Sequence, residues 1–213
     1  MSYVLVHLRG DENTRAAGHL VDHLEQTRAP IRRFQDEQPP HDEVTSTLSS
    51  TPVRTAVCVS HGSPRGLGST RQHIWADAHR LGATFVEGRL YAYACSTAGD
   101  IESLGAKAVA SGVSVFVGHD GVVHAPRPDH EQQMVSAVAS AAILAFIDGE
   151  EDERRLSQIV VDAGDGYVDE DIVLDFTGGS TWLSQSTLFD RLAFSLRVHR
   201  RTEPTPSESA PLT

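Results

Sequence analysis

The chain has 213 residues, of which 39% are hydrophobic and 22% are charged, and its formal net charge is -11. This composition is that of an ordinary globular protein and excludes a fibrous or largely disordered one. The negative charge argues against a nucleic-acid-binding protein, because phosphate contacts require a basic face.

Short apolar runs that are typical of buried strands alternate along the chain with helical patterns. In chain order, we expect strands at 3–8, 31–34, 55–60, 89–94, 113–117 and 172–176, and helices at about 13–28, 42–48, 70–81, 101–111, 130–148, 151–163 and 187–200. This alternation predicts an α/β fold with a mostly parallel central sheet of about six strands and helices on both faces. We expect one domain over residues 1–201 and a disordered tail over 202–213, which is rich in Pro, Ser and Thr.

No segment indicates export or a membrane span. The first apolar run, at 3–8, is too short for a signal-peptide core and has no basic stretch before it. The apolar segment at 134–147 is shorter than a membrane-spanning helix. The two cysteines, Cys58 and Cys95, are expected to be reduced, since a disulfide framework needs an oxidising compartment. These features predict a cytoplasmic protein without membrane contact.

Two residues with complementary chemistry follow predicted strands directly. His61 comes after the strand at 55–60, and Cys95 comes after the strand at 89–94. Right-handed crossovers place the C-terminal ends of parallel strands at one edge of the sheet, where open α/β sheets form their sites. A thiolate is a nucleophile, and a neighbouring imidazole activates it by taking the thiol proton. Neighbouring strands lie only about 4.8 Å apart, so the two side chains could meet.

The segments Val57-Cys-Val-Ser-His-Gly62 and Leu90-Tyr-Ala-Tyr-Ala-Cys-Ser96 resemble the caspase-like cysteine peptidases, which include caspases, metacaspases, gingipain-type enzymes, separases and CHAT domains. The CHAT branch is the nearest, because 104–118 and 142–149 are similar to its later helices and strand. The resemblance covers roughly residues 55–163. It implies a peptidase acting on a protein or peptide substrate, without a cofactor, and often activated by a partner protein or a signal.

The resemblance also implies residue roles. His61 is the implied general base and Cys95 the implied nucleophile, with the backbone amides of Gly62 and Cys95 as oxyanion donors. Caspase specificity for Asp is not carried over, because Cys95 is followed by Ser-Thr rather than by the caspase Arg-Gly type. Tyr93 stands where metacaspases have an acidic residue that helps to bind basic side chains, and His119 stands where CHAT domains often have Trp.

Two aspartates are candidates for binding a basic substrate side chain. Asp120 follows the strand after Cys95, and Asp100 lies just beyond the Cys95 loop. The alternative for both is a turn or helix-cap role, which we favour for Asp100 and weigh evenly for Asp120.

Other interpretations remain open for these residues. Cys95 could be a buried structural thiol, as free cysteines often are, and Cys58, inside a strand, is interpreted as core. His61 could satisfy a loop carbonyl, or belong to a metal site like that of tetrapyrrole chelatases. His19 and His23 have ligand-like spacing without a set of partners, so no metal is predicted. The alternative for the whole chain is a catalytically silent CHAT-like binding or regulatory module. A Cys95 sulfur far from any imidazole, or a cleft plugged by Trp182 and its neighbours, would favour it.

Overall fold

The computed structural model describes residues 2–52, 54–123, 129–167, 171–176 and 179–201, and for 129–130, 171–176 and 179–183 it describes the backbone alone. The tail predicted at 202–213 and the side chain of Trp182 lie outside what is described. No helix in these ranges is long and apolar enough to cross a membrane.

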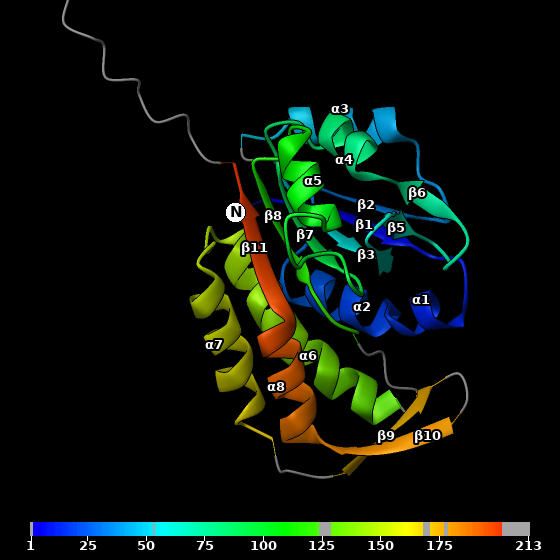
Figure 1. Ribbon diagram of the computed structural model, residues 1–213, viewed down its shortest axis with the longest axis vertical. Coiled ribbons are helices and arrows are strands. Elements are labelled where there is room, and N and C mark those ends of the chain that lie inside the picture. The colour runs from blue at the N-terminus through cyan, green and yellow to red at the C-terminus, as the bar shows by residue number, and fades with distance from the viewer. Residues whose placement is uncertain (1, 53, 124–128, 168–170, 177–178, 202–213) are drawn as a thin grey trace, which may run out of the picture.

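Six strands form the central sheet, in the spatial order β2-β1-β3-β7-β8-β11 (Figure 1). They are β1 (Val4–Leu8), β2 (Arg32–Asp36), β3 (Thr55–Val59), β7 (Arg89–Tyr93), β8 (Val115–His119) and β11 (Leu196–Arg200). Every neighbouring pair is parallel except β8 with β11. The prediction of a mostly parallel sheet of about six strands is confirmed.

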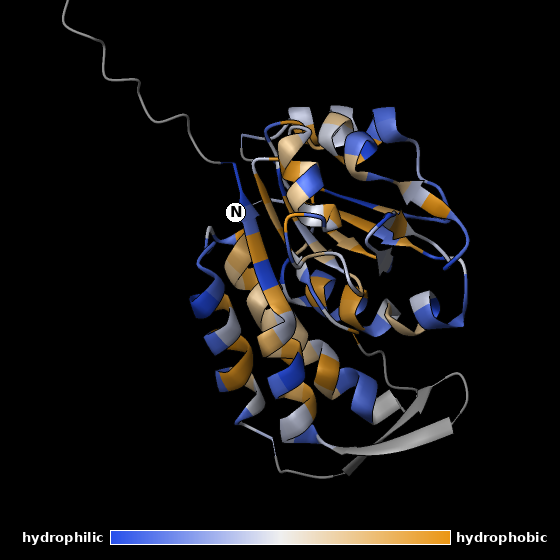
Figure 2. Cartoon of the chain, viewed as in Figure 1, coloured by the Kyte–Doolittle hydropathy of each residue, from blue (hydrophilic) through white to orange (hydrophobic). Residues whose placement is uncertain are grey.

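Helices cover both faces of this sheet, as predicted, and each face has its own apolar core. One face packs against α2 (Gly18–Thr27), α6 (Asp129–Ile147), α7 (Glu153–Gly164) and α8 (Gln185–Ser195). The other packs against α3 (His41–Ser49), α4 (Ala78–Thr84) and α5 (Leu104–Ala110), while the short α1 (Glu12–Ala16) leads into α2. Figure 2 shows hydrophobic residues gathered on the strands and on the helices beside them.

Side chains alternate between these two cores along each strand. In β7, Tyr91 and Tyr93 face the core that contains α6, whereas Leu90 and Ala92 face the core that contains α5. We call these the α6-side core and the α5-side core. A parallel strand covered on both faces needs apolar residues on both sides, which explains the nearly continuous apolar runs of the inner strands β1, β3, β7 and β8.

The chain between β3 and α4 differs from the prediction of a loop followed by a helix at 70–81. It forms a three-stranded antiparallel sheet from β4 (His61–Ser63), β5 (Gly66–Gly68) and β6 (Ile74–Ala76). Thr70 Oγ1 accepts the backbone N–H groups of Gln72 and His73 and so forms a turn. The helix begins only after Asp77, which caps it by accepting the N–H of Arg80 at 2.8 Å.

The C-terminal part of the described chain differs as well. A two-stranded sheet forms from β9 (Asp171–Phe176) and β10 (Gly179–Ser184). The helix predicted at 187–200 ends at Ser195, and the chain continues as β11, antiparallel to β8. β11 covers the edge of β8 that would otherwise be exposed. The helical pattern of residues 187–200 gives no indication of this pairing.

His119 ends β8 inside the α6-side core. Its Nδ1 lies 2.9 Å from Ser195 Oγ, and its ring meets the rings of Tyr91 and Tyr93 edge to face. Burial, together with the positive charge of Arg197, lowers the pKa of His119 from 6.5 to about 3, although a backbone hydrogen bond with Leu192 acts in the opposite direction. The folded protein therefore holds this imidazole neutral at pH 7.

We expect the free energy of unfolding to fall as the pH falls from 6.5 towards 3, because the unfolded chain then binds a proton that folded His119 excludes. This one group should cost about 2 kcal/mol at pH 5. Urea unfolding of the wild type and of His119→Phe at several pH values measures the effect, and the variant should show a flatter curve. Identical slopes in the two proteins would contradict burial of a neutral imidazole.

Candidate active site

The C-terminal ends of β1 and β3 adjoin at the point where the order of the sheet reverses. β2 lies next to β1 on one side of this point, and β7 and β8 lie beyond β3 on the other side. Open α/β sheets bind ligands in the crevice at such a switch point. Asp11 follows β1 and His61 follows β3, so both residues stand at this edge.

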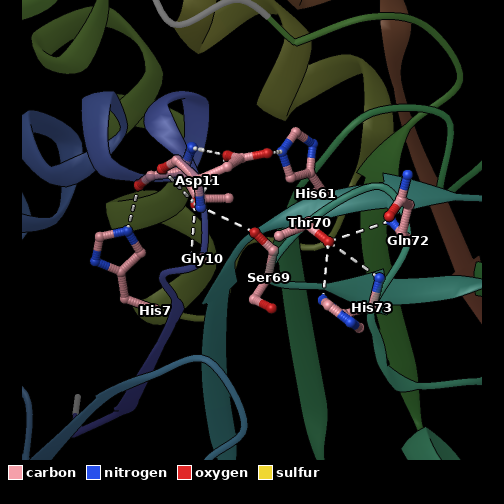
Figure 3. A network of polar contacts seen from close by, with 9 residues as sticks. His7, Gly10, Asp11, His61, Ser69, Thr70, Gln72 and His73 are labelled. Atoms are coloured by element: carbon pink, nitrogen blue, oxygen red, sulfur yellow. Dashed lines mark hydrogen bonds and ion pairs between the residues drawn. The ribbon is translucent and has the colours of Figure 1, made fainter.

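A hydrogen bond joins Asp11 and His61 across the switch point (Figure 3). Asp11 Oδ2 lies 2.7 Å from His61 Nε2, and the two side chains are 34% and 14% exposed, respectively. The other carboxylate oxygen, Oδ1, accepts the N–H of Thr14 at 3.0 Å, because Asp11 is the N-cap of α1. Burial raises the pKa of Asp11, but hydrogen bonds from Thr14 and His61 outweigh it and hold this pKa below its usual range. The carboxylate is therefore ionised at neutral pH.

The pairing of β3 with β7 carries His61 towards Cys95. Val59 lies opposite Tyr93, and the N–H of Ser60 extends the pairing by donating to the Tyr93 carbonyl at 3.3 Å. His61 and Cys95 follow directly beyond this pairing, each two residues after its strand. Within the described residues, the ring of His61 is hydrogen-bonded to Asp11 and the thiol of Cys95 to Val123, rather than to each other.

Gly62 packs directly on the backbone of the Cys95 segment. A Cβ atom at Gly62 would lie 2.3 Å from the Cys95 carbonyl oxygen, 2.5 Å from Thr97 Cγ2 and 2.8 Å from Ala94 Cβ. Only glycine permits this approach. Gly62 and Cys95, the two residues predicted to supply oxyanion donors, are therefore in contact. Gly62 directly follows the predicted base, and Cys95 is the predicted nucleophile.

The thiol of Cys95 contacts the backbone of Val123. Sγ accepts the Val123 N–H at 3.3 Å and donates its proton to the Val123 carbonyl at 3.5 Å. Burial raises the pKa of the Cys95 thiol, whereas the Val123 N–H and the positive charge of Arg71 act in the opposite direction. In this arrangement the group is a neutral thiol at pH 7.

The chain turns sharply after Cys95. Ser96 has a φ of 51°, in the left-handed region that residues with a side chain rarely adopt. Its N–H donates to the Gly121 carbonyl at 2.9 Å, and the N–H of Thr97 donates to the His119 carbonyl at 2.8 Å. These bonds tie the turn to the chain that leaves β8. Backbone strain of this kind is concentrated at functional sites.

Asp120 and Asp100, the predicted binders of a basic substrate side chain, both have partners within the chain. Asp120 Oδ2 lies 2.5 Å from Arg197 Nη2, and each side chain is about one-third exposed. Asp100 Oδ1 accepts the N–H of Glu102 at 2.9 Å in a turn, while Ser103 is the N-cap of α5. Arg197 therefore already neutralises the charge of the Asp120 carboxylate.

The remaining candidate residues are Cys58, His19 and His23. Cys58 is fully buried, and burial raises the pKa of its thiol to about 12. Among the described residues, no group of three His, Cys, Asp or Glu side chains could hold a metal ion, and this includes His19 and His23.

Asp11 was absent from the residues predicted from the sequence. One signal was available, since Asp11 follows the first strand much as His61 and Cys95 follow theirs. The pattern of Asp followed by Thr14 three residues later is also that of an ordinary helix cap, so it does not single out a site.

The chain matches no protein-family model and no curated protein. The functional argument therefore depends on the site itself. A thiol, an imidazole and an ionised carboxylate follow three adjacent strands at the switch point. This set of groups is suited to nucleophilic attack on a carbonyl carbon.

Proposed function

We propose that this chain is a caspase-like cysteine endopeptidase, nearest to CHAT domains, in which His61 takes the thiol proton of Cys95 for attack on a peptide carbonyl. The observation that carries the proposal is the contact between Gly62 and the Cys95 backbone, which holds the base and nucleophile segments together. Cys95 is also partly exposed, whereas Cys58, the other cysteine, is buried.

The proposed reaction has two stages. The thiolate sulfur of Cys95 bonds to the carbonyl carbon, and the carbonyl electrons move to an oxygen that the amides of Gly62 and Cys95 stabilise. The C–N bond then breaks, and the imidazolium of His61 gives its proton to the departing amine. Water hydrolyses the thioester, which releases a carboxylic acid and restores the thiol. The thiol must be reduced for this chemistry, so we assign the enzyme to the cytoplasm.

Activation by a partner or a signal belongs to the proposal. The contacts of the Cys95 thiol with Val123 and the raised pKa of the thiol support a resting state. The segment that leads to Val123 is attached to the rest of the fold by the ion pair between Asp120 and Arg197. Loosening this segment would expose the sulfur and favour the thiolate.

We expect Arg197→Gln to raise the rate at which iodoacetamide alkylates Cys95 at pH 7. A partly exposed ion pair contributes about 0.6 kcal/mol, so its loss should raise this rate about threefold. Asp120→Asn breaks the same pair from the other side and should act alike. Arg191→Gln, at an exposed position on α8, is the control. Unchanged rates in both pair variants would refute a restraining role for this ion pair.

A preference for a basic residue before the scissile bond is the second part of the proposal, with Asp120 as its carrier. Arg197 already occupies this carboxylate, so the position accepts a guanidinium group. Cleavage of a diverse peptide library by the wild type, with Cys95→Ala as the reference, tests the function and reports the preference together.

A further inference from the structure

We infer that Asp11 is a positioning residue of this site, whose carboxylate sets the tautomer and the orientation of His61. The inference rests on the proposed function, because it gives Asp11 a part in activating Cys95. It starts from the 2.7 Å contact between Asp11 Oδ2 and His61 Nε2.

The identity of the bonded ring nitrogen decides which atom acts as the base. An ionised carboxylate only accepts hydrogen bonds, so Nε2 of His61 must carry a proton. In a neutral imidazole the other nitrogen, Nδ1, is then the acceptor. Within the described part of the chain, Asp11 is the hydrogen-bond partner of this ring, and it uses Nε2 alone. Nδ1 is thus the atom left to take the thiol proton.

The same carboxylate stabilises the charged product of that step. When Nδ1 takes the proton, the ring becomes an imidazolium with an anion 2.7 Å from Nε2. This contact favours the ion pair of thiolate and imidazolium over the neutral pair. The positive charge of Arg71 acts on the thiol as well and also favours the thiolate.

Asp11 is held rigidly enough for this task. Its Oδ1 accepts the N–H of Thr14, and Thr14 Oγ1 accepts the N–H groups of Gly10 and Asp11 at 3.0 and 3.1 Å. The loop at 69–73 packs against this turn, so closely that a Cβ on Gly10 would lie 2.8 Å from Ser69 (Figure 3). Capping the helix uses one carboxylate oxygen, and the second is therefore free to serve His61.

Asp11→Asn separates the two roles of this residue. Asn caps helices as well as Asp does, so Oδ1 can still accept the N–H of Thr14 and the melting temperature should not change. The amide nitrogen then replaces Oδ2, donates to Nε2 of His61 and forces the proton onto Nδ1. The base is blocked, and the rate of Cys95 alkylation at pH 7 should fall at least about tenfold, with peptide cleavage falling further.

Asp152→Asn is the matched control. Asp152 caps α7 through the N–H of Arg155 at 2.9 Å, so the same change is made at the same kind of position without a histidine partner. Its alkylation rate and melting temperature should equal those of the wild type. Nitrogen-15 NMR of labelled histidine provides a direct readout, with the Nε2–H tautomer of His61 in the wild type and the Nδ1–H tautomer in Asp11→Asn.

The outcomes distinguish this inference from the proposed function. A loss of Cys95 reactivity in His61→Ala but not in Asp11→Asn overturns the role of Asp11 and leaves the peptidase proposal standing. Equal reactivity of His61→Ala and the wild type overturns the pairing of base and nucleophile itself. Should Asp11→Asn fail to fold, the wild-type spectrum still decides, because an Nδ1–H tautomer of His61 there overturns the inference.

Discussion

Replacing Cys95 with Ala is expected to abolish both peptide cleavage and labelling by acyloxymethyl-ketone probes. The reaction we propose has no second nucleophile, since Cys58 is fully buried in the α5-side core. Loss of a covalent nucleophile lowers turnover by about a thousandfold or more. The measurement is cleavage of a diverse peptide library, followed by mass spectrometry of the labelled protein.

Cys58→Ala is the matched control for this experiment. It removes the other thiol, three residues before His61 in the chain, and should leave labelling at one site per chain. Equal cleavage by Cys95→Ala and the wild type would end the peptidase proposal. If no variant cleaves or is labelled, Arg197→Gln included, the catalytically silent binding module becomes the better description.

Gly62→Ala is expected to produce the largest structural effect of any single methyl group at the site. The new Cβ would lie 2.3 Å from the Cys95 carbonyl oxygen, which is a backbone atom and cannot rotate away. The β3 and β7 ends must therefore separate, at a cost of about 1–3 kcal/mol or more in the free energy of unfolding. Separation also moves His61 from Cys95, so the alkylation rate of Cys95 should fall to that of His61→Ala.

Gly18→Ala provides the contrast. Gly18 begins α2, and a Cβ there meets nothing within 4 Å. Alanine favours a helix over glycine, so this variant should be as stable as the wild type or more stable by up to about 1 kcal/mol. Urea unfolding and alkylation rates measured on both variants make the comparison. Equal stability of Gly62→Ala and Gly18→Ala would contradict the close packing on which the site depends.

The most accurate sequence predictions concern strands that are buried on both faces. The strands at Val4–Leu8, Thr55–Val59 and Arg89–Tyr93 lie within one residue of their predicted bounds. Each is a mostly apolar run, as expected of a strand between two helical layers. His61 and Cys95 were predicted as site residues from the ends of two such strands, because parallel strands bring their C-terminal ends to one edge.

The sequence by itself therefore determined the layered α/β fold and the strand ends that carry the imidazole and the thiol, since these follow from local apolar patterns. Only the tertiary structure decided that 74–76 and 196–200 are strands, because each depends on pairing with another strand, β5 for 74–76 and the sequence-distant β8 for 196–200. It also placed Asp11 beside His61, whereas the cap that Asp11 forms on α1 can be predicted from the local sequence. The contact of Asp11 with His61 joins residues 50 positions apart, and a hydrogen bond across that separation exists only once the sheet has formed.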